Sequence, residues 1–461
     1  MEYREERDSL GIVKVPKDAY WGVQTQRAVE NFPVSGLHAH PKLIRASAVI
    51  KKAAAQANRK LGKLDDALSG KIIQAADEVM GGRFDSQFVV DVYQAGAGTS
   101  HNMNTNEVIA NRALELMGRE KGDYKSCSPN DHVNMSQSTN DVFPAAMRIA
   151  AIAAFNDLSG ELVGLSQSLS KKSAGFDHIL KSARTHLQDA VPIRLGQEFS
   201  GYAAAVERGV DRLAGAIAEL GELGLGGSAA GTGINTHKDY APLVVEYIKE
   251  ITGFDLRPSA NLFYSMQSQG AVLMASGALR AIASDLIRIA NDLRLLSSGP
   301  MTGLAEITLP AVQPGSSIMP GKVNPVMAEM LAMVGFQVCG NDRTIELAAQ
   351  AGQLELNVMM PVMAHNLLMS AEILKNAVGV FRIKCVEGIM ANEKRCREYV
   401  DKSLGIATAL NQHIGYLNAA EVAKEALKTG KSVAEVTREK GYLSEEEFRK
   451  VFDPMRLTEP N

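Results

Sequence analysis

The sequence predicts an all-α protein whose core is a bundle of long helices. In residues 203–221, apolar side chains recur at alternating steps of four and three residues, which is the spacing of one helix face. In residues 271–297 the same steps run from Leu279 to Leu296, in a segment that would form a helix of about 40 Å. Residues 143–175 and 327–385 are also long and carry few charges. We therefore expect several long helices that pack side by side.

Along the chain, the pattern divides into three predicted domains. Residues 1–138 form an N-terminal helical domain, which starts with an irregular, proline-marked segment and becomes helical from Pro41. Residues 139–390 hold the long helices, although Gly352 and Pro361 would break or bend the last of them. Residues 391–461 carry more charge and glycine-marked loops, which predicts a small C-terminal domain of short helices.

The long helices are apolar around much of their circumference. A helix of this kind has to be buried on most sides, and one bundle does not offer enough cover. We infer a homo-oligomer in which helices from different chains pack together.

Composition excludes some classes of partner. The chain has 461 residues, 46% of them hydrophobic, and a formal net charge of −3. This charge provides no strong field for nucleic acid or for an anionic membrane, but a local site could still bind an anion. The glycines of GELGLGGSAAGTG (221–233) follow no predicted strand, so a dinucleotide site is not expected.

The cysteines and the N-terminus favour a cytoplasmic location. The cysteines show neither metal-ligand nor paired spacing, which fits free thiols in a reducing compartment. The N-terminal MEYREERDSLG is densely charged, unlike a signal peptide. No uninterrupted apolar run reaches the length that spans a bilayer. The four cysteines are Cys127, Cys339, Cys385 and Cys396.

Hydroxyl and amide side chains are concentrated in four turn-like segments. Any one of them could simply cap a helix or form a turn. Together they supply neutral hydrogen-bond donors, one lysine and a few histidines, with no obvious metal site. This inventory suits a small dicarboxylate. The segments are GAGTSHNMNTNE (96–107), SPNDHVNMSQSTND (128–141), ARTHLQDAVP (183–192) and PGSSIMPGKVNP (314–325).

The last of these segments resembles the signature loop of the fumarase/aspartase superfamily, GSSxMPxKxN. The similarity extends over essentially the whole chain and includes NMNTNEVIANRALELMG, RTHLQDAVPIRLGQEF and LNQHIGYLNAAEVAKEA in the family's order. It implies an all-helical, three-domain subunit and a homotetramer whose active sites combine loops from three chains. It also implies reversible β-elimination from a dicarboxylate to give fumarate, with neither metal nor cofactor.

The resemblance assigns roles within the signature loop. Removal of a proton beside a carboxylate places negative charge on that carboxylate, so donors are needed there. Lys322 and Asn324 match the family positions that hold this group, and Ser316 matches that of the general base. The loop N–H groups and Lys322 would have to stabilise the Ser316 alkoxide. Outside this chemistry, Ser316 would form an ST-turn and Lys322 would be a solvated charge. We expect the loop to close over substrate.

The other implied residues bind substrate, assist the leaving group or support the site. His186 is the implied catalytic residue, which would either assist the leaving group or orient the substrate together with Glu329. His132 would support the site. Two implied residues, Thr99 and Asn140, lie near the leaving group. The remaining residues implied to bind substrate are Ser138, Thr139 and Ser317, for the distal carboxylate, and Thr185.

Short variants within the loops favour the aspartase branch of the superfamily. GAGTS (96–100), QSTND (137–141) and AGQLELNVM (351–359) resemble aspartases, and Ser128 stands where fumarases tend to have histidine. Met301 stands where both branches often have arginine, and Met360 stands where aspartases often have glutamate. We therefore expect an ammonia-lyase acting on L-aspartate. The alternatives are a class II fumarate hydratase, a lyase for a substituted aspartate, and an inactive structural scaffold.

Overall fold

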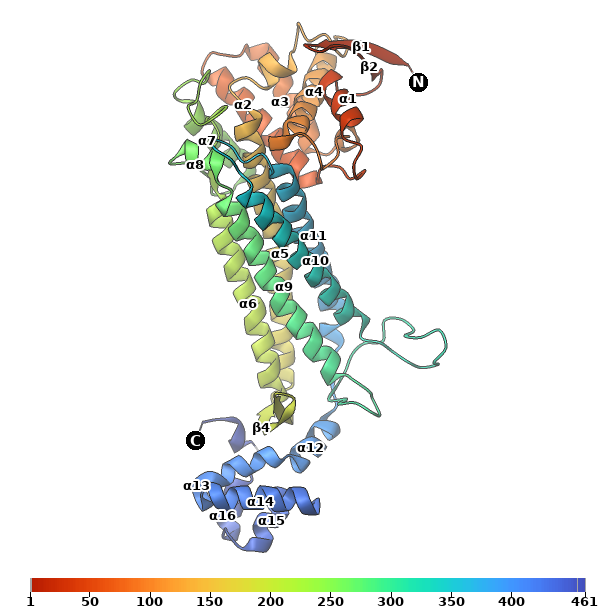
Figure 1. Cartoon of the computed structure of the whole chain (residues 1–461), viewed down its shortest axis with the longest axis vertical. Coiled ribbons are helices and arrows are strands. Elements are labelled where there is room, and N and C mark those ends of the chain that lie inside the picture. Colours follow the sequence, from red (N-terminus) through yellow and green to blue (C-terminus); the bar gives the residue numbers. More distant parts are fainter. Residues whose placement is uncertain (1, 454, 461) are drawn as a thin grey trace. The chain divides into compact units, whose positions relative to one another are not determined.

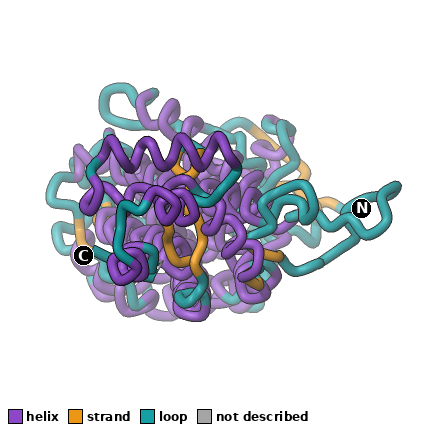
Figure 2. The backbone as a smooth tube through the Cα atoms, turned by 90° about the horizontal axis from the view of Figure 1, so that it is seen from below, coloured by secondary structure: helices purple, strands orange, loops and turns teal. Residues whose placement is uncertain are grey.

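Helices make up most of the chain, as Figure 2 shows. The computed structural model describes residues 2–453 and 455–460. The predicted helical fold class is confirmed, with one addition. In the described residues, short strands form four two-stranded sheets, β1–β2, β3–β4, β5–β6 and β7–β8. These small sheets fasten loops and termini to the helices.

The residues cluster into two compact units. Unit 1 comprises Met1–Ser159, Asp211–Ala281 and Phe336–Lys375, and unit 2 comprises Gly160–Val210, Ile282–Gly335 and Asn376–Asn461. Each long helix contributes one part to each unit. The three consecutive domains expected from the sequence stay a prediction.

The N-terminal segment is more ordered than the sequence predicted. Residues 1–40 were expected to be irregular, but they contain the antiparallel strands β1 (Tyr3–Asp8) and β2 (Gly11–Pro16) and the helix α1 (Val23–Asn31). Strand β1 reads YREERD, with a single buried side chain, Glu6. Because the strand is nearly all polar, it lacks the apolar alternation from which strands are recognised.

Three helices pack beneath this hairpin in unit 1. They are α2 (Pro41–Lys60), α3 (Asp66–Met80) and α4 (Thr99–Leu116). Their common core includes Ile44, Ile72 and Val108, each at most 2% exposed. The smaller elements of unit 1 are β5 (Glu222–Leu223), α7 (Tyr240–Thr252), β6 (Arg257–Pro258) and α8 (Leu262–Gln267).

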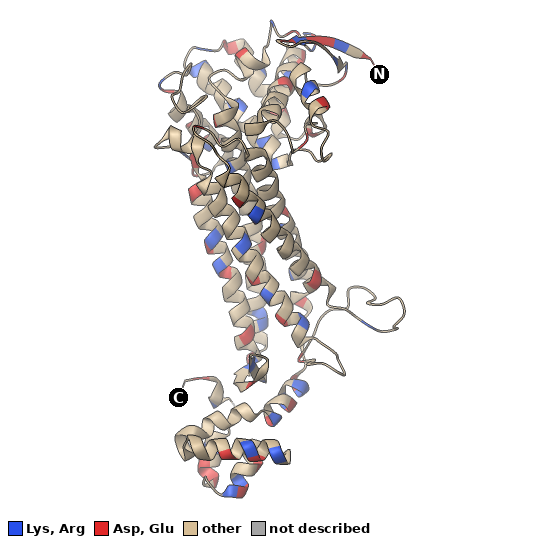
Figure 3. Ribbon diagram, viewed as in Figure 1, with Lys and Arg blue, Asp and Glu red and all other residues tan. Residues whose placement is uncertain are grey.

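Five long helices follow the predicted spacing. The predicted break in residues 327–385 is confirmed, because α10 ends at Gln350 and α11 begins at Met360. Small residues allow close helix packing: a Cβ on Gly335 would lie 2.6 Å from the Ile287 side chain. Figure 3 shows how few charges the long helices carry. The helices are α5 (Thr139–Gly175), α6 (Leu195–Leu220), α9 (Gly270–Leu296), α10 (Val326–Gln350) and α11 (Met360–Lys384), as Figure 1 labels them.

By length and composition, α5 and α9 are each long and apolar enough to cross a membrane. Neither helix is an uninterrupted apolar run, because α5 contains Arg148 and α9 contains Arg280. Their most apolar windows have mean hydropathies of 1.2 and 1.4, and 50% and 44% of each window is buried inside the chain. A core helix of a bundle has the same length and composition. Length and composition by themselves are therefore not evidence for a membrane span.

Unit 2 holds a hairpin and a group of short helices. The segment 183–192 was expected to be a loop, but it belongs to the antiparallel strands β3 (Leu180–Thr185) and β4 (Gln188–Arg194). Strand β7 (Ile307–Thr308) pairs with β8 (Met390–Ala391). The short helices are α12 (Glu393–Lys402), α13 (Asn411–Ile414), α14 (Tyr416–Thr429), α15 (Val433–Lys440) and α16 (Glu445–Val451).

Candidate active site

The signature loop lies between β7 and α10 and is closed by its own hydrogen bonds. The Gly315 N–H donates to the Lys322 carbonyl at 2.8 Å. The Asn324 side-chain amide donates back to the Gly315 carbonyl at 2.7 Å. A Cβ on Gly315 would lie 2.4 Å from the Lys322 oxygen, so only glycine permits this closure. The predicted residues of the segment thus share one closed loop.

Ser316 accepts two backbone hydrogen bonds within this loop. Its hydroxyl oxygen accepts from the N–H of Ile318 at 3.2 Å and of Met319 at 3.0 Å. This is the ST-turn that a purely structural role predicts. The same two N–H groups also stabilise negative charge on the oxygen, which an alkoxide base requires. A catalytic role of Ser316 would therefore use the same geometry as its structural role.

Lys322 and Ser317 are exposed on the loop. Within the described part of the chain, Lys322 forms no ion pair, so its ammonium is available to an anionic ligand. Glu329 lies in the first turn of α10, where its backbone N–H donates to the Pro325 carbonyl at 3.1 Å. The described residues show no ion pair between Glu329 and His186.

Thr185 and His186 lie at the tip of the β3–β4 hairpin. Thr185 pairs with Gln188, so His186 and Leu187 form the turn, and their φ angles are +55° and +59°. Positive φ at both positions is the type I′ geometry, which strongly prefers asparagine and glycine. Residues with larger side chains adopt positive φ at a cost of about 1–3 kcal/mol each, and such residues are often found at functional sites. The turn exposes the His186 ring.

A buried charge cluster supports this hairpin. The Glu306 carboxylate is fully buried and pairs with Arg184 at 2.9 Å and with Lys181 at 3.1 Å. Lys181 also pairs with Glu198 at 2.7 Å. Because Glu306 directly precedes β7, the cluster fixes the hairpin to the strand that leads into the signature loop. Sequence analysis missed this cluster, since its members lie far apart in the chain.

In unit 1, two helix N-termini lie side by side. Thr99 is the first residue of α4 and Thr139 is the first residue of α5. The Asn102 amide, in the first turn of α4, donates to the Thr139 hydroxyl at 3.1 Å. Helix N-termini present free N–H groups and partial positive charge, which favour a carboxylate. The predicted residues from the first two polar segments are therefore brought together.

The start of α5 is fixed by Ser138 and Asp141. The Ser138 hydroxyl accepts from the Asn140 N–H at 3.2 Å, as a helix cap does. The Asp141 carboxylate is 1% exposed and accepts N–H bonds from Ser138, Gly226 and Ser228. Burial raises the pKa of Asp141 to about 6, and these hydrogen bonds oppose the shift.

Asn140 and His132 also make local contacts. The Asn140 amide donates to the Ala229 carbonyl at 2.8 Å. His132 lies in a short helical turn, Pro129–Val133, and its Nδ1 accepts from the Ser128 N–H at 2.9 Å. A neutral His132 ring therefore carries its proton on Nε2. This contact gives His132 a structural role in its own turn.

Sequence analysis also missed a buried lysine behind these helix starts. Lys51 of α2 is 0% exposed, and its Nζ donates to the side-chain oxygens of Asn102, Asn134 and Gln137 at 2.8–2.9 Å. Burial lowers the pKa of Lys51 to about 7, and the charge of Asp141 opposes the shift. The sequence does contain a sign that Lys51 is buried. Lys51 shares the buried stripe of α2 with Ile44, Ser47, Ala54 and Asn58, at helical steps of three and four.

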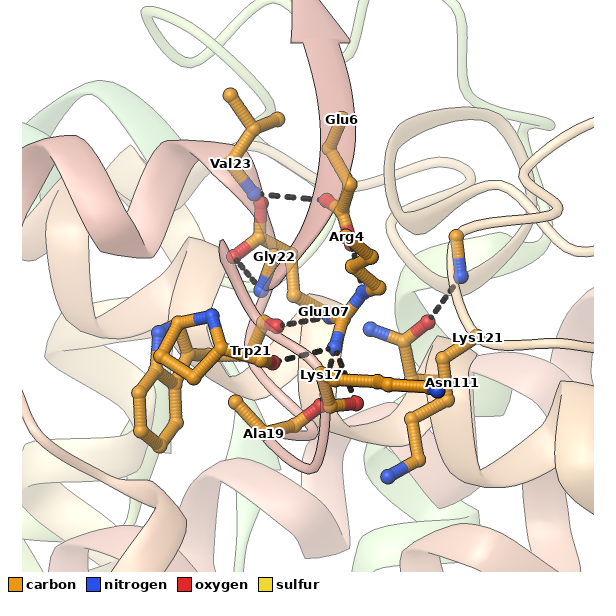
Figure 4. Close-up of polar contacts among 12 residues, drawn as sticks. Arg4, Glu6, Lys17, Ala19, Trp21, Gly22, Val23, Glu107, Asn111 and Lys121 are labelled. Atoms are coloured by element: carbon orange, nitrogen blue, oxygen red, sulfur yellow. Dashed lines mark hydrogen bonds and ion pairs between the residues drawn. The ribbon is translucent and has the colours of Figure 1, made fainter. Parts of the chain in front are cut away.

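A second buried ionisable group, Glu107, holds α4 to the start of α1. Glu107 of α4 accepts N–H bonds from Gly22, Gln24 and Thr25 at 2.8–3.1 Å, as Figure 4 shows in part. Burial raises the pKa of Glu107 to about 7, and the same hydrogen bonds oppose the shift. The contact ties the start of α1 to α4, the helix that begins at Thr99.

The predicted residues thus fall into three groups. Unit 1 gathers Thr99, Ser138, Thr139 and Asn140 at two helix starts, and unit 2 holds the signature loop and the hairpin tip. No hydrogen bond or ion pair joins the tip to the loop in the described residues. Among those residues, no group of three or more His, Cys, Asp or Glu side chains could hold a metal ion.

Two family models match the chain. A model described as Lyase matches residues 11–340, and one described as Fumarase C C-terminus matches residues 406–459. Together they cover the signature loop and the short C-terminal helices from α13 to α16.

Whole-chain relatives carry the names of two related lyases. The chain is 50% identical over 459 residues to an aspartate ammonia-lyase of Bacillus sp, covering 100% of this chain and 98% of the relative. It is 54% identical over 458 residues to a class II fumarate hydratase of Halobacterium salinarum, covering 99% and 97%. The crystal structure of a fumarate lyase:delta crystallin from Brucella melitensis, bound to cobalt, is 49% identical with a TM-score of 0.96 over 100% of both chains. The chain therefore belongs to the fumarase/aspartase superfamily of lyases.

Proposed function

We propose that the protein is an aspartate ammonia-lyase, which eliminates ammonia from L-aspartate reversibly to give fumarate. The observation that carries this choice is the pair of loop variants GAGTS (96–100) and QSTND (137–141), which resemble aspartases. GAGTS lies at the start of α4 and QSTND lies at the start of α5. The hydrogen bond from Asn102 to Thr139 joins these two helix starts. The Bacillus relative at 50% identity supports the same choice.

In the first step, the Ser316 alkoxide takes the proton from C3 of L-aspartate. The electron pair of the broken C–H bond moves into the adjacent carboxylate, giving an aci-carboxylate that carries an extra negative charge. The Lys322 ammonium and the Asn324 amide stabilise this charge. One N–H of Asn324 already donates to Gly315, which leaves its second N–H for substrate.

In the second step, the C–N bond breaks. The electron pair of the aci-carboxylate returns to form the C2–C3 double bond, and the bonding pair leaves with the nitrogen as ammonia. The amine needs no extra proton, because it enters as an ammonium. In this scheme Thr99 and Asn140 contact the leaving nitrogen, and His186 assists its departure.

The rest of the site holds the distal carboxylate and excludes water. Ser138, Thr139 and Ser317 bind that carboxylate in this proposal, with Thr185 adding a contact and with Glu329 and His132 in support. The signature loop closes over the substrate. We further propose a cytoplasmic homotetramer whose subunits have domains at 1–138, 139–390 and 391–461, with each site built from loops of three chains.

One specific observation favours a second candidate, class II fumarate hydratase. The Halobacterium salinarum relative with that name is 54% identical over nearly the whole chain. A lyase for a substituted aspartate is a further alternative.

The test is a paired assay of one enzyme preparation. Fumarate formation from L-aspartate and from L-malate is followed by ultraviolet absorbance, and ammonia is measured in the same samples. We expect fumarate and ammonia in equal amounts from L-aspartate. Fumarate from L-malate alone would replace the proposal with the hydratase, and no product from either substrate would point to a substituted aspartate or to a scaffold.

A further inference from the structure

A single buried lysine organises the polar groups behind the start of α5. Lys51 is fully buried, and its Nζ donates to Asn102 Oδ1 at 2.8 Å and to Asn134 Oδ1 and Gln137 Oε1 at 2.9 Å. An ammonium has three N–H donors and no acceptor, so these three amide oxygens satisfy it completely. Burying such a group is costly, and an apolar residue would fill the same helix stripe without that cost.

The lysine sets the orientation of the neighbouring amides. When Lys51 is protonated it only donates, so the oxygen of Asn102 has to face it and the NH₂ group of Asn102 has to face away. That NH₂ group donates to the Thr139 hydroxyl at 3.1 Å and to Asn134 Oδ1 at 3.2 Å. Asn134 is held in turn, since its own NH₂ donates to the Gln137 carbonyl at 3.1 Å. The direction of each hydrogen bond therefore traces back to the ammonium.

This orientation leaves the proton of the Thr139 hydroxyl available. The Thr139 oxygen accepts from Asn102, so its single O–H has to donate elsewhere. Within the described residues, no acceptor for this O–H is found. Thr139 is half-buried at the N-terminus of α5, where an anion is favoured.

We propose that Lys51 is a positioning residue, which acts through Asn102 to aim the Thr139 hydroxyl proton at a carboxylate of the substrate. The inference rests on the proposed function, in which Thr139 binds the distal carboxylate. Without the lysine, the Asn102 amide is free to flip, and the Thr139 hydroxyl would then donate to Asn102 and be lost to the substrate.

Asn102→Asp is the sharpest test. An aspartate keeps an oxygen on Lys51 and gives the ammonium a charged partner, which offsets the loss of the N–H bond to Asn134 Oδ1. The thermal midpoint of the variant checks that it folds. The aspartate has no N–H to donate, so the Thr139 hydroxyl turns toward it instead of toward the substrate. We expect KM to rise about tenfold or more, the size of one lost hydrogen bond to a charged group, with kcat changed far less. A wild-type KM would overturn the proposal.

Lys51→Met and Thr139→Val complete a double-mutant cycle. Each single variant is expected to raise KM by a similar factor, and the double variant is expected to be no worse than Thr139→Val alone, because both changes remove one interaction. If the KM increases of the two single variants multiply in the double variant, Lys51 has a merely structural role and the proposal is overturned. The control is Lys52→Met, which removes a charge from the surface of the same helix, where Lys52 pairs with Asp77.

Binding of succinate, measured by calorimetry, separates this inference from the proposed function. Succinate has both carboxylates and no leaving group, so its affinity reports the site without turnover. We expect Asn102→Asp and Lys51→Met to weaken succinate by the same factor as they raise KM. If wild type binds succinate but converts neither L-aspartate nor L-malate, the proposed reaction fails while the positioning role is still measured. Unchanged succinate affinity in the two variants would overturn the positioning role alone.

Discussion

The backbone N–H of Met319 donates a hydrogen bond of 3.0 Å to the hydroxyl oxygen of Ser316. The N–H of Ile318 converges on the same oxygen at 3.2 Å. Two donors on one oxygen favour its negatively charged form over its neutral form. In the proposed mechanism, these two donors would prepare Ser316 to act as the base before any substrate contact is made.

Ser316→Ala should remove the base and leave the binding groups in place. We expect kcat to fall by about 10²–10⁴-fold, the usual contribution of a general base, with KM close to that of wild type. Steady-state kinetics on the substrate identified by the paired assay measure both constants. Gln313→Ala, on the same loop, serves as the control and should be fully active. Normal turnover by Ser316→Ala would exclude Ser316 as the base.

Lys322→Met should affect both binding and chemistry. The ammonium attracts the substrate carboxylate in the ground state, and it stabilises the larger charge of the aci-carboxylate in the transition state. We expect KM to rise about tenfold and kcat to fall about 10²–10³-fold. Lys322→Arg restores the charge but not the compact geometry, so it should recover binding more than turnover. Kinetic constants equal to those of wild type would eliminate the carboxylate role of Lys322.

Gly315→Ala should disrupt the loop without disturbing the core. Its Cβ would lie 2.4 Å from the Lys322 carbonyl oxygen and 2.8 Å from the Asn324 nitrogen, and both are backbone atoms that have to move. We expect kcat/KM to fall at least about tenfold, because small misplacements in a site are costly, while the thermal midpoint stays nearly constant. Gly70→Ala, in open space on α3, is the control. Full activity of Gly315→Ala would show that the hydrogen bonds joining Gly315 to Lys322 and Asn324 are dispensable.

Glu107 should make stability depend on pH. Burial raises its native pKa from 4.5 to about 7, so the native carboxyl keeps its proton where the unfolded chain has lost it. The stabilisation is complete below about pH 4.5 and is lost as pH rises toward 7. The free energy of unfolding of wild type, relative to Glu107→Gln, should therefore fall by up to about 3 kcal/mol across this window.

Urea unfolding at a series of pH values measures this difference. The matched control is Glu120→Gln, which changes an exposed glutamate four residues beyond the end of α4 and should track wild type at every pH. A difference between wild type and Glu107→Gln that is constant, or that grows with pH, would show that the three N–H bonds to Glu107 outweigh its burial.

The sequence predicted the long helices well, because apolar residues at steps of three and four mark a buried helix face directly. It was wrong about two hairpins for a physical reason. Strand β1 is almost entirely polar, and the β3–β4 turn uses His186 and Leu187 at positive φ, where asparagine and glycine are the recognisable signals. Strand β1 and the β3–β4 turn therefore lack the signals from which a hairpin is identified.

Within the candidate site, the sequence predicted the local turns and caps better than the buried residues that hold the site in place. The ST-turn of Ser316 and the capping of α5 follow from local spacing, and the structure contains both. Lys51 and Glu306 were missed, because each acts through partners that are distant in sequence. A lysine is ordinarily assigned to the surface, and only its place on the buried stripe of α2 distinguishes Lys51.

The most direct test of the central claim is a crystal structure of Ser316→Ala with L-aspartate bound. We predict that the loop covers the ligand, with the residue 316 side chain directed at C3 at near-attack distance, about 3–4 Å, and with Lys322 and Asn324 on the adjacent carboxylate. A structure in which residues 314–325 contact no part of the bound L-aspartate would contradict the account.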